Sequence, residues 1–501
     1  MLNLLTTDQI RATDSITLKN QLVSSSDLME RAANAFVTAF TQTFTNPDDS
    51  ISVYCGTGNN GGDGLAIARL LKEQGYERIS VRIARFNLGS SADFETNLKR
   101  LELTGITAAQ IEKDADLPEE DSDILIDALL GSGLNRPLGY AFKNLIEYLN
   151  SLKKIIVSVD LPSGFTSEGI IDQNAIVIKA DLVISFQLPK INFFFPESAT
   201  AVKQFKYLSI GLDEEFIQSQ PVSWKLTEPA DILKIIKPRH QFSHKGTYGH
   251  ALIIAGNTET MGAALLCADA CLHSGSGLTT ACIPEEGLYA LNSRSPEIMA
   301  ILRYKNKILN LEFGKYQAVA IGPGIGKTED DYIFLHYVIK NCTSKLVLDA
   351  DALNIIAGKP DLLKLLPNKT ILTPHLKEFD RLFGEHTNWW DRINTARQNA
   401  AAYQIVIVLK NRYTFIVLPA GDVIINPTGN PAMAVGGMGD VLTGIITSFL
   451  AQGFKPEDAA IAACYLHGKT GDIIYEKSRM HCIPPRYIIN RLPKTIGSFI
   501  G

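Results

Sequence analysis

The sequence predicts an α/β protein with two doubly wound α/β/α domains. Short apolar segments typical of buried strands alternate with segments of helical periodicity along most of the chain, which favours parallel sheets covered by helices. The alternation is interrupted between about Asp213 and Pro238, where three prolines stand and no clear strand is predicted. At 501 residues the chain is long enough for two hydrophobic cores. We place the junction near residues 214–225 and expect domains at residues 1–218 and 219–501.

Composition is that of an ordinary globular protein, with 46% hydrophobic and 20% charged residues. A net charge of −5 gives no electrostatic basis for binding nucleic acid or an acidic membrane. No apolar run approaches ~18 residues and the first residues do not resemble a signal peptide, so we expect no membrane span and a cytoplasmic location. The seven cysteines include no Cys-x-x-Cys pair. We therefore expect no disulfide framework, and interpret Cys267 and Cys271 as small core residues.

The first half opens with two predicted helices from Thr6 to about Phe44, the first capped by Thr7 and Asp8. A strand over residues 51–55 then leads through a glycine-rich loop, residues 56–64, into another helix. The loop does not fit the dinucleotide-binding fingerprint, but it carries asparagine and aspartate side chains without an evident structural need. Further strands are expected at residues 79–84, 123–130, 154–160, 181–186 and 205–210.

Polar side chains recur at the carboxyl ends of these strands, namely Asp127, Asp160, Ser163 and Lys190. In an open parallel sheet these ends line the ligand crevice. A single aspartate at a strand end is usually a cap or turn residue. Four such ends, each beside a glycine or proline turn, favour a binding site.

The second half begins afresh with a buried strand over residues 250–256 and a helix of small residues over 260–277. A second helix is expected near Arg392–Tyr403. Alternating strands and helices again predict a doubly wound sheet. The strands are expected within residues 277–283, 318–326, 346–354, 370–382, 405–411, 413–419 and 422–426.

Three glycines, Gly436, Gly437 and Gly439, stand directly before Asp440, and an apolar helical segment follows. Backbone N–H groups of such a turn can converge, and the helix start adds its positive dipole end, which together favour phosphate binding. A carboxylate placed there would repel phosphate but is well placed to take a proton from an acceptor hydroxyl during phosphoryl transfer. Alone, the motif is more often a tight turn; the rest of the chain favours the catalytic interpretation.

His375 and Glu378 follow another predicted strand and are three residues apart, on one side of a helix start. They could bind a metal directly, although two ligands are weak evidence. Glu378 could hold water around a Mg²⁺ ion that bridges nucleotide phosphates, and His375 could contact substrate. A helix cap formed by the pair is an equally good interpretation.

Other residues complete the predicted phosphoryl-transfer site. The loop Gly322–Gly326 ends a strand, and Lys410 follows another strand and could reach a phosphate or simply be solvated. Asp349 and Asp351 are candidates for supporting carboxylates or helix caps. The chain has neither a Walker GxxxxGK[ST] loop nor protein-kinase signatures.

Four motifs of the second half resemble the ADP- or ATP-dependent NAD(P)H-hydrate dehydratases of the ribokinase-like superfamily. These motifs are HKGTYGHALIIAG, GPGIG, TPHLKEF and NPTGNPAMAVGGMGDVLTG. In the first half NNGGDG, DALLGSGLNRPL, DLPSG and the surroundings of Lys190 resemble the Rossmann-like NAD(P)H-hydrate epimerase domain. The chain thus resembles, over nearly its whole length, the bifunctional nicotinamide nucleotide repair family.

This resemblance implies metabolite repair. The epimerase would interconvert (R)- and (S)-NAD(P)HX at C6, and the dehydratase would convert only the S form to NAD(P)H at the expense of ADP, giving AMP and phosphate. Hydroxide is a poor leaving group, so phosphorylation of the C6 hydroxyl, with Asp440 as base, would allow phosphate to leave instead. The substrates would be NADHX and NADPHX, with ADP favoured over ATP, and the family forms homo-oligomers.

The resemblance also implies roles for residues of the first domain. Asp160 and Lys190 are suggested as the proton-handling pair, and Asn60, Asp127 and Ser163 would hold a K⁺ ion. The hydrated nucleotide would be bound by Asn59, Asn60, Gly61, Gly62, Asp63, Gly131, Ser132, Gly133, Leu134, Asn135, Arg136, Pro137 and Asp160.

In the second domain the resemblance assigns a Mg²⁺ ion, a substrate site and a nucleotide site. Ala263, Gly324 or a neighbouring glycine, His375 and Asp440 would face the hydrated nucleotide. ADP would be bound by Lys410, Asn411, Arg412, Tyr413, Thr414 and Gly439. The segment after Lys410 is bulkier than the small, glycine-containing segment usual in the family.

Two alternatives compete with repair. A small-molecule kinase that leaves a stable phosphate ester would explain Asp440 and its glycines but not the motifs of the first domain. In the other alternative the first domain is a non-catalytic binding or oligomerisation module, against which Asp160 and Lys190 weigh.

Overall fold

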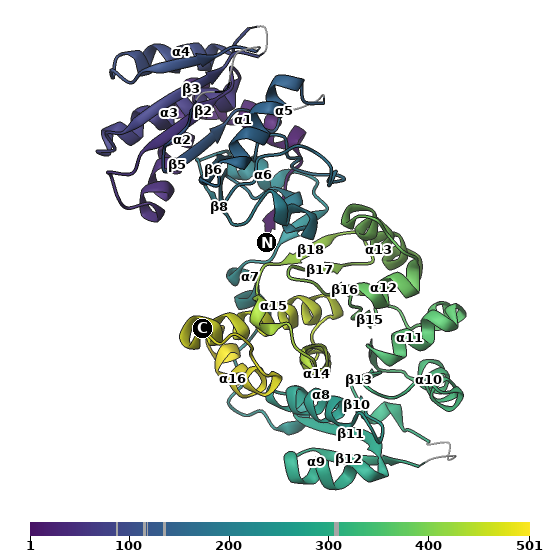
Figure 1. The fold of residues 1–501 in the computed structure, drawn as a ribbon. Helices are drawn as coiled ribbons and strands as arrows, with labels where there is room; N and C mark the ends of the chain where they lie inside the picture. The colour runs from purple at the N-terminus through teal and green to yellow at the C-terminus, as the bar shows by residue number, and fades with distance from the viewer. Residues whose placement is uncertain (87–88, 114–116, 118, 134–136, 305–309, 501) are drawn as a thin grey trace. The chain divides into compact units, whose positions relative to one another are not determined.

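The computed structural model describes residues 1–86, 89–113, 117, 119–133, 137–304 and 310–500. The chain divides into two compact units (Figure 1). The N-terminal unit comprises Asn3–Val222 with Asn388–Trp390, and the C-terminal unit comprises Met1–Leu2, Ser223–Thr387 and Asp391–Gly501. Both are α/β, as predicted, and each is described by itself.

The N-terminal unit contains a seven-stranded sheet in the order β4-β3-β2-β5-β6-β7-β8, with every described neighbouring pair parallel. This order reverses direction between β2 and β5, which is where an open α/β sheet binds ligands. The strands are β2 (Ile51–Cys55), β3 (Ile79–Ala84), β4 (Ala108–Ile111), β5 (Ile124–Ala128), β6 (Ile155–Val159), β7 (Leu182–Phe186) and β8 (Phe205–Leu208).

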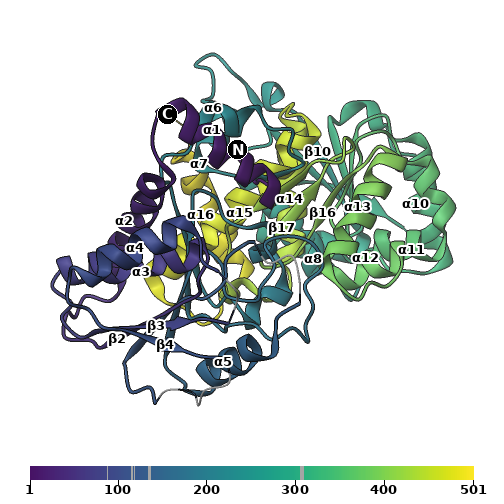
Figure 2. The same ribbon diagram turned by 90° about the horizontal axis from the view of Figure 1, so that it is seen from above.

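Helices cover both faces of this sheet, with α2, α3 and α4 on one face and α5 on the other (Figures 1 and 2). Successive strand residues enter two separate cores, since Val53 packs with the first group and Tyr54 with the second. The helices are α1 (Thr7–Gln21), α2 (Ser25–Thr43), α3 (Asn59–Glu73), α4 (Ala92–Glu102), α5 (Tyr140–Ser151) and α6 (Glu214–Ser219).

Three local expectations for this unit were wrong. The first helix is capped by Thr6, which exchanges hydrogen bonds with Gln9 in a capping box, and not by Thr7 and Asp8. The helix after β2 begins at Asn59, so most of the expected glycine loop is helical. Strand β4 was missed because its half-exposed sequence, AAQI, has little strand propensity and depends on pairing with β3.

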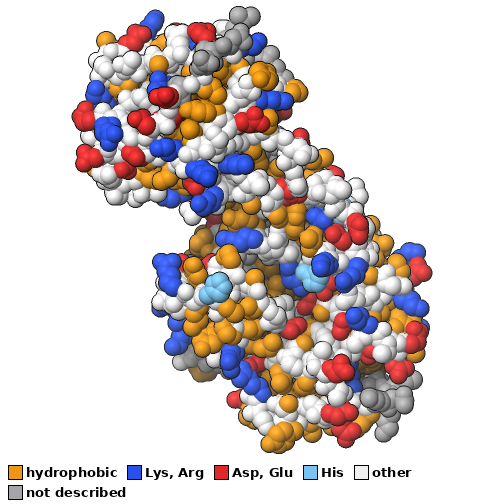
Figure 3. All heavy atoms as spheres, in the orientation of Figure 1, with side chains coloured by type: hydrophobic (Ala, Val, Ile, Leu, Met, Phe, Trp, Pro, Cys, Tyr) orange, Lys and Arg blue, Asp and Glu red, His pale blue; other side chains and the backbone are white. Residues whose placement is uncertain are grey.

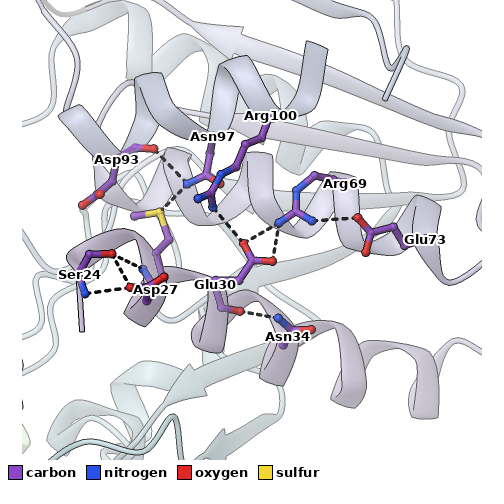
Figure 4. A network of polar contacts seen from close by, with 10 residues as sticks. Ser24, Asp27, Glu30, Asn34, Arg69, Glu73, Asp93, Asn97 and Arg100 are labelled. Carbon is purple, nitrogen blue, oxygen red and sulfur yellow. Dashed lines mark hydrogen bonds and ion pairs between the residues drawn. The ribbon is translucent and has the colours of Figure 1, made fainter. Parts of the chain in front are cut away.

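A polar network joins α2, α3 and α4 (Figure 4). The carboxylate of Glu30 on α2 accepts from Nη2 of Arg69 on α3 at 2.6 Å and lies 3.5 Å from Nη1 of Arg100 on α4. Nη1 of Arg69 also donates to Glu73 at 2.9 Å. A forked guanidinium that binds two carboxylates fixes orientation, so the network holds α3 in register with its two neighbours.

The second sheet has the order β1-β9-β18-β17-β16-β15-β14-β13-β10-β11-β12. From β16 through β12 the neighbouring pairs are parallel, whereas β16, β17 and β18 form an antiparallel meander. The strands are β1 (Leu2–Asn3), β9 (Trp224–Leu226), β10 (His250–Ile254), β11 (Leu278–Pro284), β12 (Met299–Arg303), β13 (Ala318–Ile321), β14 (Lys345–Leu348), β15 (Ile371–Leu372), β16 (Val406–Leu409), β17 (Thr414–Val417) and β18 (Val423–Asn426).

The helices α10 to α13 lie on one face of this sheet, and α8, α14, α15 and α16 lie on the other (Figures 1 and 2). The helices are α7 (Pro229–Ile235), α8 (Met261–His273), α9 (Leu288–Arg294), α10 (Glu329–Asn341), α11 (Asp351–Gly358), α12 (Leu376–Phe383), α13 (Trp389–Tyr403), α14 (Met438–Ala451), α15 (Pro456–Ser478) and α16 (Pro485–Gly497).

Helices α8 and α14 approach unusually closely. A Cβ built at Gly444 would lie 2.1 Å from the carbonyl oxygen of Cys267. Cys267 and Cys271 are buried and free, so the prediction that they are small core residues is confirmed. The close packing fixes the start of α14, where Asp440 lies.

The expectation of no strand between about Asp213 and Pro238 was wrong. Strand β9 forms there and pairs in parallel with β18, a contact between segments about 200 residues apart that local pattern cannot show. Strand β12 was also missed. None of the helices in the described parts of the chain is long and apolar enough to cross a membrane. On the face shown in Figure 3, basic and acidic side chains are interspersed.

Candidate active sites

Asp440 lies in the first turn of α14, directly after a turn that Gly437 makes possible with φ +91°. A Cβ built at Gly439 would lie 3.3 Å from Nζ of Lys410, so the glycine leaves room for this ammonium close to the helix start. Burial, and next the carboxylate of Asp349, raise the pKa of Asp440 to about 7. Asp440 thus has the pKa of a general base at neutral pH.

Asp349, at the end of β14, is the hub of this site. It is buried, and its two oxygens accept from Nζ of Lys410 at 2.9 Å and Oγ1 of Thr443 at 2.7 Å. Burial raises the pKa of Asp349, but the Lys410 ammonium and the Thr443 hydroxyl outweigh it and hold the pKa below its ordinary range. Asp349 therefore keeps its charge and fixes Lys410 beside the start of α14.

The backbone after β14 is strained where it meets the loop Gly322–Gly326. Ala350 has φ +50°, unusual for a residue with a side chain. A Cβ at Gly322 would lie 1.8 Å from the carbonyl oxygen of Asp349, and Oδ2 of Asp351 accepts from the N–H of Gly326 at 3.1 Å. Asp351 thus holds this loop at the carboxyl edge of the sheet.

His375 and Glu378 form a helix cap at the start of α12. Nδ1 of His375 accepts from the N–H of Lys377 at 3.1 Å and of Glu378 at 3.3 Å, while Oε2 of Glu378 accepts from the N–H of His375 at 2.9 Å. Burial lowers the pKa of His375 below its ordinary value. The backbones of His375 and Lys410 also pair in a parallel β-bridge. The capping pair therefore lies beside the Asp349–Lys410 ion pair.

Ala263 and Gly324 are linked through one residue, Thr260. Oγ1 of Thr260 donates to the carbonyl oxygen of Gly324 at 2.7 Å, and the N–H of Ala263 donates to the carbonyl oxygen of Thr260 at 3.1 Å. Gly324 has φ +62°. The predicted substrate-facing positions therefore lie at one edge of the C-terminal sheet, joined by Thr260, which the sequence analysis missed.

The predicted nucleotide-binding segment forms the turn between β16 and β17. The guanidinium of Arg412 lies 4.6 Å from the centroid of the Tyr413 ring, and Nη1 of Arg412 donates to the carbonyl oxygen of Pro427 at 3.4 Å. The bulky side chains noted in the sequence thus stack on each other along the turn. Residues 411–413 belong to the segment that is bulkier than is usual in the family. They lie in this turn, and β16 and β17 pair with each other on either side of it.

The segment that precedes the glycine turn is fastened to α15. The carboxylate of Asp472 accepts from the N–H of Gly429 at 3.0 Å and from Nδ2 of Asn430 at 2.9 Å. A Cβ at Gly468 would lie 2.4 Å from Oγ1 of Thr428. Asp472 was not predicted from the sequence, because a carboxylate within a helical pattern usually indicates a solvated face.

In the N-terminal unit, Asn60, Asp127 and Ser163 converge at the switch point of the sheet. Asp127 is buried and accepts from Oγ of Ser163 at 2.5 Å and Oγ of Ser158 at 2.7 Å. Nδ2 of Asn60 donates to the carbonyl oxygen of Val159 at 3.0 Å, while its Oδ1 is buried with no hydrogen-bond partner among the described residues. Burial raises the pKa of Asp127 above its ordinary value.

Asp160 and Lys190 form a largely buried ion pair at 2.8 Å. Oδ1 of Asp160 also accepts from Oγ of Ser185 at 3.0 Å and from the N–H of Phe186 at 2.9 Å, and its backbone is held at φ +63°. Burial, and next the charge of Asp160, raise the pKa of Asp63 well above its ordinary value. The carboxyl groups of Asp63 and Asp160 and the ammonium of Lys190 therefore lie near one another at this edge of the sheet.

The start of α3 needs its glycines for packing. A Cβ at Gly61 would lie 1.8 Å from the carbonyl oxygen of Gly56, and a Cβ at Gly62 would lie 2.9 Å from Sδ of Met29. Asn59, the first residue of α3, is exposed. The first turn of α3 thus presses against the end of β2 and presents polar side chains at the sheet edge.

Gly131, the first residue of the predicted 131–137 segment, also lies at this edge, because a Cβ at Gly131 would lie 3.2 Å from Cβ of Asn60. Leu134, Asn135 and Arg136 lie outside the described residues, so the structure does not place these predicted contacts.

The two sites define a two-unit α/β enzyme, with a Rossmann-order sheet in one unit and a phosphoryl-transfer type of site in the other. One family model, described as NAD(P)H-hydrate dehydratase, matches residues 251–494, and another, YjeF-related protein N-terminus, matches residues 25–192. A ribokinase-like superfamily protein of known structure from Enterococcus faecalis is 28% identical, with a TM-score of 0.50, over 56% of this chain and 97% of its own.

Relatives match nearly the whole chain. The bifunctional NAD(P)H-hydrate repair enzyme Nnr of Moorella thermoacetica is 31% identical over 94% of this chain and 92% of its own length. The enzyme of that name from Escherichia coli K12 is 34% identical over 84% of this chain and 80% of its own. The chain belongs to the family of bifunctional NAD(P)H-hydrate repair enzymes, so the resemblance inferred from the motifs is confirmed.

Proposed function

We propose that the C-terminal unit dehydrates (S)-NAD(P)HX to NAD(P)H at the expense of ADP, giving AMP and phosphate. The observation that supports this most is the placement of Asp440 at the start of α14, with its pKa raised to about 7 and Lys410 held beside it by Asp349. A base, a fixed ammonium and a helix N-terminus together suit transfer of a phosphoryl group to a hydroxyl.

In the proposed reaction, Asp440 takes the proton of the C6 hydroxyl as its oxygen bonds to the terminal phosphorus of ADP. The bond from that phosphorus to the bridging oxygen breaks, and AMP leaves. The C6–O bond then breaks with its electrons going to phosphate, and loss of a proton from C5 restores the ring double bond. Lys410 and the N–H groups at the start of α14 stabilise the phosphate charge in both steps.

The charges around Asp440 are compatible with a Mg²⁺ ion. Four carboxyl groups, those of Asp349, Asp351, Glu378 and Asp440, interact around the ammonium of Lys410. This excess of negative charge would repel a bare nucleotide, and a divalent ion bound to the phosphates would offset it. Since Glu378 and Asp351 already hold backbone N–H groups, we expect them to contact the ion through water.

We propose that the N-terminal unit epimerises (R)- and (S)-NAD(P)HX, with Asp160 and Lys190 in the reaction site. The unpartnered Oδ1 of Asn60 and the buried carboxylate of Asp127, beside Ser163, fit a K⁺ ion, which takes oxygen ligands. Such an ion would neutralise Asp127 and fix the loops at the switch point. Assembly into a homo-oligomer stays a prediction of the family resemblance.

A coupled assay tests this function. The full chain receives (S)-NAD(P)HX with ADP or ATP, and nicotinamide absorbance and free phosphate are followed together. We expect equal amounts of NAD(P)H and phosphate, faster with ADP, and a loss of roughly 10²–10⁴-fold in Asp440→Ala, the usual contribution of a general base. A stable phosphorylated hydrate would identify a kinase instead, and an alanine variant as fast as the parent would overturn the role of Asp440.

A further inference from the structure

Helix α1 lies against the loops that form the proposed epimerase site. Oγ1 of Thr7 lies 2.8 Å from Oγ of Ser167, and the N–H of Thr7 donates to Oε1 of Glu168 at 3.2 Å, in the loop that follows β6. One turn further, Nη2 of Arg11 lies 3.9 Å from a Cβ built at Gly133 in the loop that follows β5. The helix therefore crosses the carboxyl edge of the sheet beside its switch point.

The next position on the same face of α1 is Asp14. Residues 7, 11 and 14 follow the four- and three-residue spacing that aligns side chains along a helix. The carboxyl group of Asp14 makes no hydrogen bond or ion pair with the described residues, although it is partly buried. An acidic group with no structural partner, on the face of α1 that contacts the loops after β5 and β6, is poorly explained as a stabilising residue.

The charged groups that face Asp14 are those of the proposed epimerase site. Asp14 interacts electrostatically with Asp160, which follows β6, and with Lys190, which follows β7. Asp63 on α3 in turn interacts with both Asp160 and Asp14. Burial, and next the charge of Asp160, raise the pKa of Asp14 to about 6. Asp14 thus exchanges its proton close to neutral pH.

Asp160 itself is badly placed to exchange protons alone. Its Oδ1 accepts from Nζ of Lys190, Oγ of Ser185 and the N–H of Phe186. Three donors on one oxygen occupy its lone pairs, so Oδ1 has no lone pair left to accept a proton. A second proton-carrying group is therefore required if the C6 hydroxyl is to leave one face of the ring and water is to enter the other.

We infer that α1 forms a wall of the epimerase site and that Asp14 is a catalytic acid–base residue, partnered across the substrate by the Asp160–Lys190 pair. This inference rests on the proposed epimerase function. The family model that matches the N-terminal unit begins at residue 25, after α1 has ended, so Asp14 lies outside the residues that it matches.

The proposed step conserves atoms and charge. The C6–O bond breaks with its electron pair on oxygen, Asp14 gives that oxygen its proton, and water leaves as the ring nitrogen's lone pair forms a double bond to C6. Water then bonds to C6 from the opposite face, and its proton goes to the Asp160–Lys190 pair. The reverse direction exchanges the two roles, and solvent returns the proton.

The test uses the full chain with ADP omitted, so that dehydration does not consume the S form, and follows interconversion of (R)- and (S)-NAD(P)HX by separating the epimers. We expect Asp14→Asn to lower the rate roughly 10²–10⁴-fold, and Asp14→Glu to retain much of it. The matched control is Asp8→Asn on the same helix, whose side chain is 92% exposed and which should match the parent.

A pH profile separates catalysis from a structural role. The parent should show a change in kcat/KM near pH 6 that Asp14→Asn lacks and Asp14→Glu keeps, with thermal unfolding of all three alike. An active parent whose Asp14→Asn variant interconverts the epimers at the same rate would overturn the assignment of Asp14. A parent that does not interconvert them at all would overturn the proposed function of the unit instead.

Discussion

The surroundings of Asp440 suit a general base, but they lower the free energy of unfolding when its carboxylate is ionised. Its pKa of about 7 in the folded protein, caused by burial and then by Asp349, exceeds the ordinary aspartate pKa of 3.8. Between these values the folded chain binds a proton that the unfolded chain does not, so this group makes stability fall as pH rises, by at most about 1.4 kcal/mol per pH unit. Above pH 7 the ionised carboxylate carries its full cost.

We therefore predict that Asp440→Asn raises the free energy of unfolding at pH 8 and that the gain shrinks towards pH 4. Urea denaturation of parent and variant at both pH values measures this. Asp330→Asn, an exposed position at the start of α10, is the control and should show no such pH-dependent gain. A gain that is equal at both pH values would show that Asp440 is not destabilised by its charge.

The charge of Asp440 destabilises the folded protein, whereas the Asp349–Lys410 ion pair should stabilise it. Asp349 is 2% exposed, and its removal leaves Lys410, 20% exposed, without its partner at 2.9 Å. Breaking a buried pair in this way typically costs about 3–5 kcal/mol. We predict that Asp349→Ala lowers the free energy of unfolding by an amount close to this range. The variant should also bind ADP more weakly.

Urea denaturation and a titration of turnover against ADP check this prediction. Asp361→Ala is the matched control, since Asp361 pairs with Lys364 at 2.9 Å but both side chains are largely exposed. Exposed pairs contribute about 0–1 kcal/mol. Equal losses in the two variants would remove the special role given to Asp349.

At the scale of elements, the contact of α15 with the segment at Thr428 decides where the glycine turn begins. Glycine to alanine within a helix normally stabilises by ~1 kcal/mol. At Gly468, however, the new Cβ would lie 2.4 Å from Oγ1 and 2.5 Å from the carbonyl carbon of Thr428. The segment would have to move, and the hydrogen bonds from Gly429 and Asn430 to the carboxylate of Asp472 would be lost.

We predict that Gly468→Ala lowers the free energy of unfolding by about 1–3 kcal/mol, the usual cost of overpacking, and slows dehydration. The control is Gly358→Ala at the end of α11, where a Cβ would meet nothing within 4 Å. Thermal unfolding and the dehydration assay give both readouts. Normal dehydration in Gly468→Ala would show that this segment does not position Asp440.

At the scale of the whole molecule, each unit carries its own ionisable site, so the two activities should be separable. We predict that Lys190→Ala still dehydrates (S)-NAD(P)HX at the parent rate but leaves (R)-NAD(P)HX unrepaired above its spontaneous conversion. Asp440→Asn should do the reverse and convert either epimer into a mixture. Offering each epimer with ADP to both variants measures this, and (R)-NAD(P)HX repaired at the parent rate by Lys190→Ala would contradict it.

The local sequence pattern was sufficient to predict a strand, helix or turn wherever its own residues carry a clear signal. Continuous apolar strands such as β10 and β16, the helix of small residues α8, and the glycine turn before Asp440 were all visible in the sequence. Strand β9 was missed because its partner β18 lies about 200 residues away, and β4 and β12 were missed because their largely unburied segments lack a continuous apolar pattern. The order of motifs indicated the family because each keeps its residue types at fixed spacing.

The sequence by itself determined the α/β class, the family and the identity of the acidic and glycine-rich motifs. The family resemblance already paired Asp160 with Lys190, but only the tertiary structure decided that Asp349 meets Lys410 and that Asp14 lies near the Asp160–Lys190 pair. The physical reason is that charge interactions and pKa values depend on distance and burial, which follow from packing segments that the chain keeps far apart.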